Sequence, residues 1–307
     1  MANTLQAQLV GLSQRIYKEW IAKTVLVQSC DRSFEGEFNL ERNEIDIPVY
    51  HDLSVHKTTL KERELKPAPL EFMKSSTIRV TVDKARYSHW GHLKISTIVE
   101  RLSQEDSETR KKLVNRWARE AEDELALWVA GLPSRQEIDL SALLADQTTN
   151  PNGLLTPDNI VLALDILKAK IIEKNMEVAD FRLFTSERFR SIARDAKILT
   201  GANLDANEPF RKGFVDIING IKIYEHECAA ITTRSASTGL VIEETAIWKS
   251  TDGIQYVVPY KNTIAYDIPP TEVLMGAKGY QTVEYYDFFN LYPTRLYKVK
   301  IKYAVSS

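Results

Sequence analysis

Cysteine is scarce in this sequence, since Cys30 and Cys228 are the two that occur among 307 residues and no CxxC pair is present. This excludes a zinc ribbon and a disulfide framework, and it fits a reducing compartment. No apolar run approaches the ~18 residues that a membrane-spanning helix requires. The first residues also lack the basic leader and the apolar core of a secretory signal. We therefore expect a protein without membrane contact that is made and used in the cytoplasm.

An excess of charge of one sign is also missing, because 40 Lys and Arg residues are balanced by 42 Asp and Glu residues, for a net charge of −2. Nothing in this balance indicates a general affinity for nucleic acid. Hydrophobic residues make up 44% of the chain and charged residues 27%, which allows a substantial core. The length suits one large domain or two ordinary ones.

Motifs of catalysis and cofactor binding are missing too. The sequence has no G-x-x-x-x-G-K-[ST] phosphate loop, no G-x-G-x-x-G after an expected strand and no G-x-S-x-G. Two weak patterns keep a metal-dependent enzyme as an alternative. His89 and His92 form H-W-G-H without a further ligand motif, and Glu64 and Lys66 form the E-x-K tail of a nuclease signature. We expect neither pattern to hold a metal, and we expect no cofactor.

The longest clear pattern that is present predicts a helix over residues 103–131. Its apolar stripe recurs at steps of four, four, four and three residues and comprises Leu113, Trp117, Ala121, Leu125 and Trp128. Ser103 with an acidic first turn favours a helix start, and Gly131 favours its end. A helix of about 28 residues is roughly 42 Å long, which suits a spine with a sheet packed against it. We predict that both tryptophans are buried and that charges of both signs point outward: Arg110, Arg116, Glu120 and Asp123.

A second amphipathic helix is expected over residues 4–22. One of its faces carries Leu5, Leu9, Leu12, Ile16 and Trp20. Such a helix near the end of a chain must dock on something, either on its own core or on a neighbouring subunit. For the second case, the candidate interface residues are Leu5, Leu9 and Trp20.

Residues 34–84 change to the period of strands. Alternating apolar positions occur in two segments, one with Ile45, Ile47 and Val49 and the other with Ile78, Val80 and Val82. The polar, largely charged segment between them is long for a hairpin loop. We predict an extended two-stranded arm, which needs a partner surface because an isolated hairpin is marginally stable. Its basic residues are candidate subunit contacts: Lys57, Lys61 and Arg63.

A compact α/β unit is expected over residues 156–260. Thr156 and Pro157 favour a helix start, and the stripe that follows comprises Ile160, Leu164, Leu167 and Ile171. A buried strand over 181–185 and a helix capped by Ser186 come next. Asn219-Gly220 between two alternating runs is typical of a type I′ hairpin. The last part, 261–307, ends in a strand whose lysine stripe could meet phosphates or could be a solvated face, and it contains Lys298, Lys300 and Lys302.

In this order of parts the chain resembles the major capsid proteins of tailed bacteriophages, which share the Hong-Kong-97-type fold. The resemblance lies in T-P-D-N-I-V-L-A-L-D-I-L followed by F-R-L-F-T-S-E-R-F-R, and most specifically in G-F-V-D-I-I-N-G-I-K-I-Y-E. It implies an α+β fold in five parts. These are an N-terminal arm (1–33), an extended loop (34–84), a peripheral domain with the spine helix (85–155), an axial domain (156–260) and return strands of the peripheral domain (261–307).

A protein of this family would be a structural subunit and not an enzyme. The resemblance implies self-assembly as pentamers and hexamers into an icosahedral head around double-stranded DNA, in a virion assembled in the host bacterial cytoplasm. Portal, scaffolding or decoration proteins would be its partners, and packaged DNA would be contacted without specificity, with Lys298, Lys300 and Lys302 as candidates. We identify no lysine–asparagine pair for crosslinking and expect non-covalent assembly. An encapsulin-like compartment shell is the alternative within the same fold.

Overall fold

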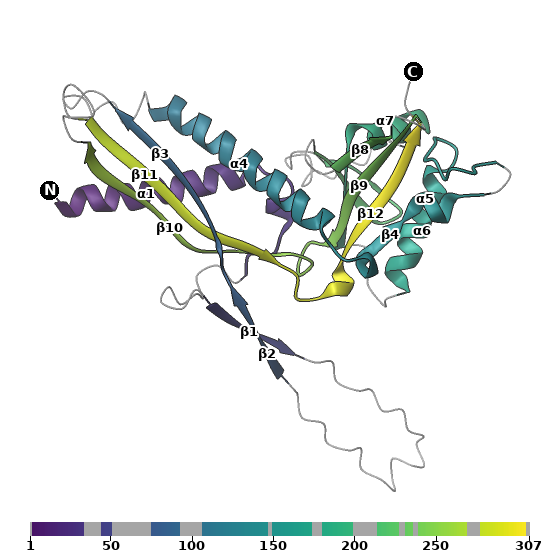
Figure 1. Cartoon of the computed structure of the whole chain (residues 1–307), viewed down its shortest axis with the longest axis horizontal. Coiled ribbons are helices and arrows are strands. Elements are labelled where there is room, and N and C mark those ends of the chain that lie inside the picture. The colour runs from purple at the N-terminus through teal and green to yellow at the C-terminus, as the bar shows by residue number, and fades with distance from the viewer. Residues whose placement is uncertain are drawn as a thin grey trace, which may run out of the picture.

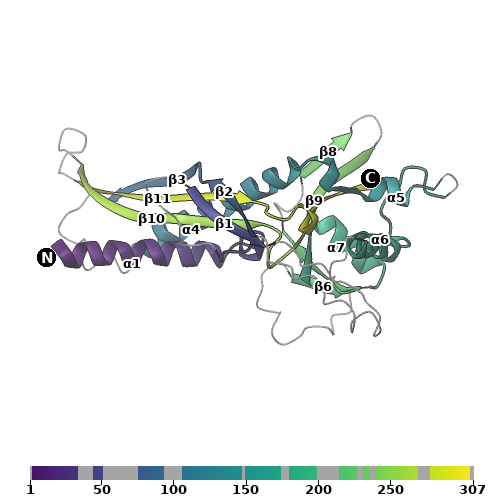
Figure 2. The same cartoon turned by 90° about the horizontal axis from the view of Figure 1, so that it is seen from below.

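The computed structural model describes residues 2–33, 44–50, 75–92, 106–146, 149–173, 180–198, 214–226, 231–235, 239–268 and 277–304. The chain forms an elongated layer of two long helices and a three-stranded sheet, a two-stranded arm and an α/β unit (Figure 1). Figure 2 shows the N-terminal helix running along the three-stranded sheet, with the shorter helices gathered at the opposite end of the molecule.

The elongated layer is built on the spine helix α4 (Asp106–Ala130) and the N-terminal helix α1 (Ala2–Ile21). Its antiparallel sheet has the order β10-β11-β3 and comprises β10 (Gln255–Ile268), β11 (Ala277–Phe289) and β3 (Lys84–His92). Both helices pack on one face of this sheet, because Arg86 of β3 lies over Trp20 of α1 and over Trp117 of α4, at 5.4 and 5.8 Å from the ring centroids. The predicted spine helix against a sheet is confirmed within the described residues.

The buried face of the spine differs slightly from the predicted stripe. It comprises Val114, Trp117, Ala118, Ala121, Leu125 and Val129, while Leu113 and Trp128 are only partly buried. The prediction that Trp128 is buried is therefore wrong, since its ring lies at the edge of the core, 6.5 Å from the Phe288 ring. On the outward face Arg116 pairs with Glu120 at 2.8 Å and Asp123 is exposed, as predicted, while the side chain of Arg110 lies outside the described part.

The arm consists of β1 (Glu44–Tyr50) and β2 (Ser75–Thr81), which pair antiparallel in a sheet of their own. Ile47 faces Ile78 in the register, and the Arg79 guanidinium pairs with the Asp46 carboxylate at 2.9 Å. The two strands run away from the elongated layer (Figure 1). The two predicted strands are confirmed, whereas residues 51–74 lie outside the described part, and with them Lys57, Lys61, Arg63, Glu64 and Lys66.

The α/β unit is organised on a seven-stranded sheet with the order β4-β12-β9-β5-β7-β6, in which β8 pairs with β9. Its strands are β4 (Glu137–Asp139), β5 (Phe181–Thr185), β6 (Phe214–Ile218), β7 (Ile221–Glu225), β8 (Ile231–Ser235), β9 (Leu240–Lys249) and β12 (Leu296–Ala304). The unit's helices are α5 (Leu140–Leu144), α6 (Ile160–Ile172) and α7 (Glu187–Asp195). Short 3₁₀ turns are η1 (Val27–Ser29), η3 (Ser134–Gln136) and η5 (Pro293–Arg295).

Local sequence signals account for much of this unit. The predicted stripe of α6 is confirmed, because its four apolar residues are buried. The helix begins at Ile160 rather than after Thr156, since the Asn159 side chain accepts the Thr156 backbone N–H at 2.8 Å and the intervening residues form a turn. Asn219 and Gly220 have φ values of 54° and 86°, so the type I′ hairpin is confirmed as well.

The three-stranded and seven-stranded sheets divide the chain at other positions than the domain boundaries expected from the sequence. Strand β12 pairs antiparallel with β9 and parallel with β4, so residues 296–304 belong to the seven-stranded sheet. Among the described residues of 261–307, the parts in β10 and β11 join the three-stranded sheet with β3. The expected return of 261–307 to one peripheral domain is therefore wrong for its last strand. Residues 137–144, which form β4 and α5, likewise join the α/β unit.

Candidate functional site

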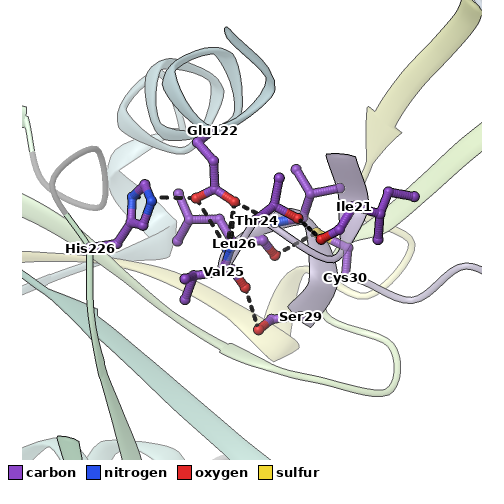
Figure 3. Close-up of polar contacts among 9 residues, drawn as sticks. Ile21, Thr24, Val25, Leu26, Ser29, Cys30, Glu122 and His226 are labelled. Carbon is purple, nitrogen blue, oxygen red and sulfur yellow. Dashed lines mark hydrogen bonds and ion pairs between the residues drawn. The ribbon is translucent and has the colours of Figure 1, made fainter. Parts of the chain in front are cut away.

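The spine, the segment after α1 and the end of β7 meet at a buried carboxylate (Figure 3). The Glu122 side chain accepts the backbone N–H groups of Val25, Leu26 and Val27 at 2.7, 2.9 and 3.4 Å. Its second oxygen lies 3.4 Å from Nδ1 of His226, directly after β7. We call these five residues the carboxylate joint. It ties the N-terminal helix to the spine and places the α/β unit against both.

The local sequence explains why this segment needs an external acceptor. Residues 25–29 follow the end of α1 and turn into η1, and the first N–H groups of a helical turn have no partner within it. Side chains bind two of the backbone carbonyls here. The hydroxyl of Thr24 donates to the Ile21 carbonyl at 2.7 Å, and that of Ser29 donates to the Val25 carbonyl at 2.8 Å. The backbone N–H groups of residues 25–27 converge on the Glu122 carboxylate.

Burial sets the electrostatics of the joint. Glu122 is 1% exposed. This burial raises its pKa to about 7, against the hydrogen bonds from Leu26, Val25 and Val27, which favour the charged form. The neighbouring Asp123 adds to the upward shift. The carboxylate joint therefore changes its protonation state near neutral pH.

A second polar cluster lies inside the elongated layer. The guanidinium of Arg86 is buried over the Tyr286 ring, at 4.4 Å from its centroid, and lies 3.7 Å from the Glu124 carboxylate. Nearby, the hydroxyl of Tyr256 donates to the Glu284 carboxylate at 2.9 Å. Burial raises the pKa of Glu284 to about 7, while the charge of Arg86 opposes that shift. This cluster joins β3, β10, β11 and α4 by charged and aromatic contacts, which fixes the spine on its sheet.

The lysine stripe predicted to face DNA is largely engaged within the chain. Lys298 is 8% exposed, and its ammonium lies 3.0 Å from the Glu137 carboxylate of β4. Lys300 lies 3.9 Å from the Asp139 carboxylate on the same strand. Burial would raise the pKa of Asp139, but hydrogen bonds from Ser141 and Ala142 and then the charges of Lys300 and Lys302 lower it. For Lys298 the expected DNA-facing role is therefore wrong, because the parallel pairing of β4 with β12 supplies a carboxylate that the strand pattern could not reveal.

Of the residues of α1 that were proposed for a subunit interface, the one whose side chain is described lies in the core of its own chain. Trp20 is 0% exposed and packs edge-on against Tyr17 and Tyr256 in the core of its own chain, so its assignment to an interface is wrong. The side chains of Leu5 and Leu9 lie outside the described part of the structure. Within that part, α1 docks on the core of its own chain, which was the first of the two possibilities left open by the sequence.

The described geometry does not support the alternative of a metal-dependent enzyme. Positions 89 and 92 are three residues apart on β3, which pairs with β11 in an unbroken register, so they belong to opposite faces of the sheet. The described residues contain no group of three His, Cys, Asp or Glu side chains that could hold a metal ion. Cys30 is buried, and that burial raises its pKa well above the usual range, which makes it a packing residue.

Glu122 is the functional residue that sequence reasoning missed. The helical pattern placed it outside the apolar stripe with the other charged residues of the spine. Its position relative to Ala118 and Ala121 was an available signal, since two small residues beside an acid allow another backbone to approach that face of the helix. The acceptor and the amides that it binds are 95 to 97 residues apart in sequence, so no local pattern could identify the partner.

No family model matches the chain, and no curated protein matches it. The capsid of Ralstonia phage GP4 has a similar structure, with a TM-score of 0.58 and 9% identity over 90% of this chain and 87% of that chain. A structure from Mycobacterium phage Che8 gives 0.54 and 12% over 90% of each chain. A virus-like particle from Pyrococcus furiosus gives 0.50 and 11% over 96% of this chain and 99% of that chain.

These similarities extend over nearly the whole chain, although the sequences have diverged almost completely. The chain therefore has the Hong-Kong-97-type fold of phage capsid proteins, and the expected fold class is confirmed. Among the described helices, none is long and apolar enough to cross a membrane.

Proposed function

We propose that this chain is the major capsid subunit of a tailed bacteriophage, a structural protein and not an enzyme. Copies of it assemble as pentamers and hexamers into an icosahedral head around double-stranded DNA, so the protein is a component of the virion. The observation that carries the proposal is the similarity to phage capsid structures over about 90% of the chain. Portal, scaffolding or decoration proteins are its further partners, as the fold family implies.

The physical properties of the chain support assembly. A net charge of −2 allows many copies to pack without strong mutual repulsion. The carboxylate joint and the Arg86 cluster hold the spine, its sheet and the N-terminal helix together, so the subunit can act as one building block. The arm of β1 and β2 forms a separate two-stranded sheet, and such a pair is marginally stable without a partner surface.

Negative-stain microscopy of the expressed protein tests this proposal. We expect closed shells of uniform size that elute as very large particles on a sizing column. Particles isolated from the host that protect double-stranded DNA from nuclease support the phage head. Shells that enclose protein and no genome would instead favour the encapsulin-like compartment, for which the similarity to the Pyrococcus furiosus particle is the relevant observation. A monomer that never assembles would contradict both.

The arm provides the first prediction. Deleting residues 54–67, which lie outside the described part, removes most of the segment between β1 and β2 and none of the residues of the three described sheets. We expect a soluble, folded subunit that no longer forms shells, because the arm contacts a neighbouring copy. Circular dichroism checks the fold and microscopy checks assembly. Normal shells from the deletion variant would show that the arm does not carry the interface.

The engaged lysine provides the second prediction. Replacing Lys298 by glutamine leaves the Glu137 carboxylate without its partner at a largely buried position, and we expect a loss of about 2 kcal/mol in the free energy of unfolding. Lys302→Gln is the matched control, since this more exposed residue lies on the same strand, and we expect a clearly smaller loss, from its weak contribution to the lowered pKa of Asp139. Urea unfolding of the unassembled subunits measures both. Equal effects would indicate that the Lys298 ion pair contributes nothing.

A further inference from the structure

A pocket of about 210 Å³ opens beside the carboxylate joint. One side is formed by the segment after α1, which supplies Gln28 and Arg32. The other side comes from the seven-stranded sheet, through Arg182 of β5, Tyr224 of β7 and Ser250 directly after β9. The pocket is thus lined by two guanidinium groups, an amide and hydroxyls, and none of the described residues that line it is acidic.

The sheet side of the pocket is held in place by aromatic packing. The guanidinium of Arg182 lies over the Tyr224 ring, 5.6 Å from its centroid. Tyr224 stacks on Phe184 at 5.5 Å, and Phe184 stacks on Trp248 at 4.0 Å. These rings belong to the hydrophobic core, so the position of Arg182 is restricted before any ligand arrives.

The two arginines act on the same region from two different segments. The pKa of the neighbouring Cys30 thiol is raised by burial and by the charges of Glu122 and Asp31, while the charges of Arg32 and Arg182 both oppose that shift. Their positive potentials therefore overlap at this end of the N-terminal segment. An anion in the pocket would bring a charged acceptor to both, and would connect residues 28–32 with β5.

We propose that this pocket binds a single phosphate group. A guanidinium presents a planar fork that matches phosphate oxygens in pairs. Two such forks with an amide and a hydroxyl offer more donors than the roughly four acceptor positions of one carboxylate. The volume is below the roughly 300 Å³ at which pockets for drug-sized ligands begin, so the site suits one small group.

The phosphate has two possible sources, the free ion and a phosphodiester of packaged DNA. The second source rests on the proposed function, whereas the first does not depend on it. The pocket differs from the lysine stripe of β12 in that no carboxylate of the described residues lines it, while Lys298 and Lys300 face the acids of β4. It is therefore the better location in the described chain for a phosphate contact.

Calorimetric titration of the full-length, unassembled chain with inorganic phosphate tests the site. We expect saturable binding that Arg32→Gln weakens about tenfold or more, since a charge-assisted bond is lost. Arg32 is exposed, so this variant should fold normally. Arg182→Lys keeps the charge and removes the fork, and a similar loss is expected. The control is Arg116→Gln, an exposed spine residue that pairs with Glu120 and should leave phosphate binding unchanged.

Several outcomes would overturn the proposal. These are absent phosphate binding, an equal loss in Arg116→Gln, or acetate binding as tight as phosphate, which would make the site a carboxylate receptor. A short DNA duplex that displaces phosphate in a manner sensitive to Arg32→Gln identifies DNA as the source, and a duplex that leaves phosphate bound identifies the free ion. Microscopy of the same preparations reports shell formation separately. Failure to assemble would thus count against the proposed function, while the phosphate titration alone decides the site.

Discussion

Replacing Trp117 by alanine is expected to destabilise the folded subunit by about 3–5 kcal/mol, the usual cost of removing a large buried side chain. Trp117 is 2% exposed in the hydrophobic core under the spine. Its indole N–H donates to the Ser88 hydroxyl of β3 at 2.6 Å, and the Arg86 guanidinium lies over its ring. Alanine would leave a cavity and remove a partner of a buried cation. We expect the loss to appear as insoluble subunits and not as altered shells.

Trp128→Ala is the matched control, because it removes the same side chain from the same helix. Trp128 lies at the edge of the core, so part of its surface is already in contact with water. We expect less than half of the destabilisation seen at Trp117. Urea unfolding followed by circular dichroism on unassembled subunits gives both values, where refolding conditions yield soluble protein. Equal losses at the two positions, or a fold that tolerates Trp117→Ala, would contradict this account of the spine.

Helical and strand periodicity predicted the main elements because each depends on residues that are close in sequence. The spine, the N-terminal helix, the two strands of the arm and the Asn219-Gly220 hairpin all lie where their patterns placed them. The same reasoning failed at details that depend on neighbours in space. Trp128 continues the apolar period of the spine but is only partly buried at the edge of the core, and Trp20 lies in the core of its own chain.

Sheet membership was the least predictable feature. Strand β4 has three residues, too few for any period to be recognised, yet its parallel pairing with β12 assigns two distant segments to the seven-stranded sheet. That pairing also brings Lys298 and Lys300 close to the carboxylates of Glu137 and Asp139, which are more than 150 residues earlier in the chain. The face of β12 that its alternation predicted to be solvated carries a buried Lys298 beside the half-buried Lys300 and Lys302.

The buried charged residues could not be recognised from the sequence for a related reason. In the sequence, Glu122 and Arg86 resemble the exposed charges around them, and a charged residue is seldom fully buried unless it is paired. Their partners come from segments that the fold brings together: three backbone amides for Glu122, and aromatic rings with carboxylates for Arg86. The candidate phosphate pocket has the same origin, because Arg32 and Arg182 are 150 residues apart in sequence and line one cavity.

The carboxylate joint leads to a prediction about pH. The pKa of Glu122 is raised from an ordinary value of 4.5 to about 7 in the folded chain, with burial as the main cause. Between these two values, the folded state keeps a proton that the unfolded state has released. The stability that this proton contributes is fully present below pH about 4.5 and is lost as the pH rises through about 7. At about 1.4 kcal/mol per pH unit, the loss amounts to roughly 3 kcal/mol.

Glu122→Gln removes this titration while keeping the size and shape of the side chain. The free energy of unfolding of the wild type minus that of the variant is therefore expected to fall by roughly 3 kcal/mol between pH 4.5 and pH 7.5. Glu284, whose pKa burial also raises to about 7, titrates in both proteins and cancels in the difference. Glu284→Gln is the matched control, since it should keep the part of the slope that belongs to Glu122. Urea unfolding of unassembled subunits across this pH range measures the difference. A difference that stays constant would mean that the pKa of Glu122 is unchanged by folding, and that the N-terminal segment is fixed to the spine with equal strength at every pH. A difference that grows with pH would mean that folding lowers this pKa; either result would contradict the raised value.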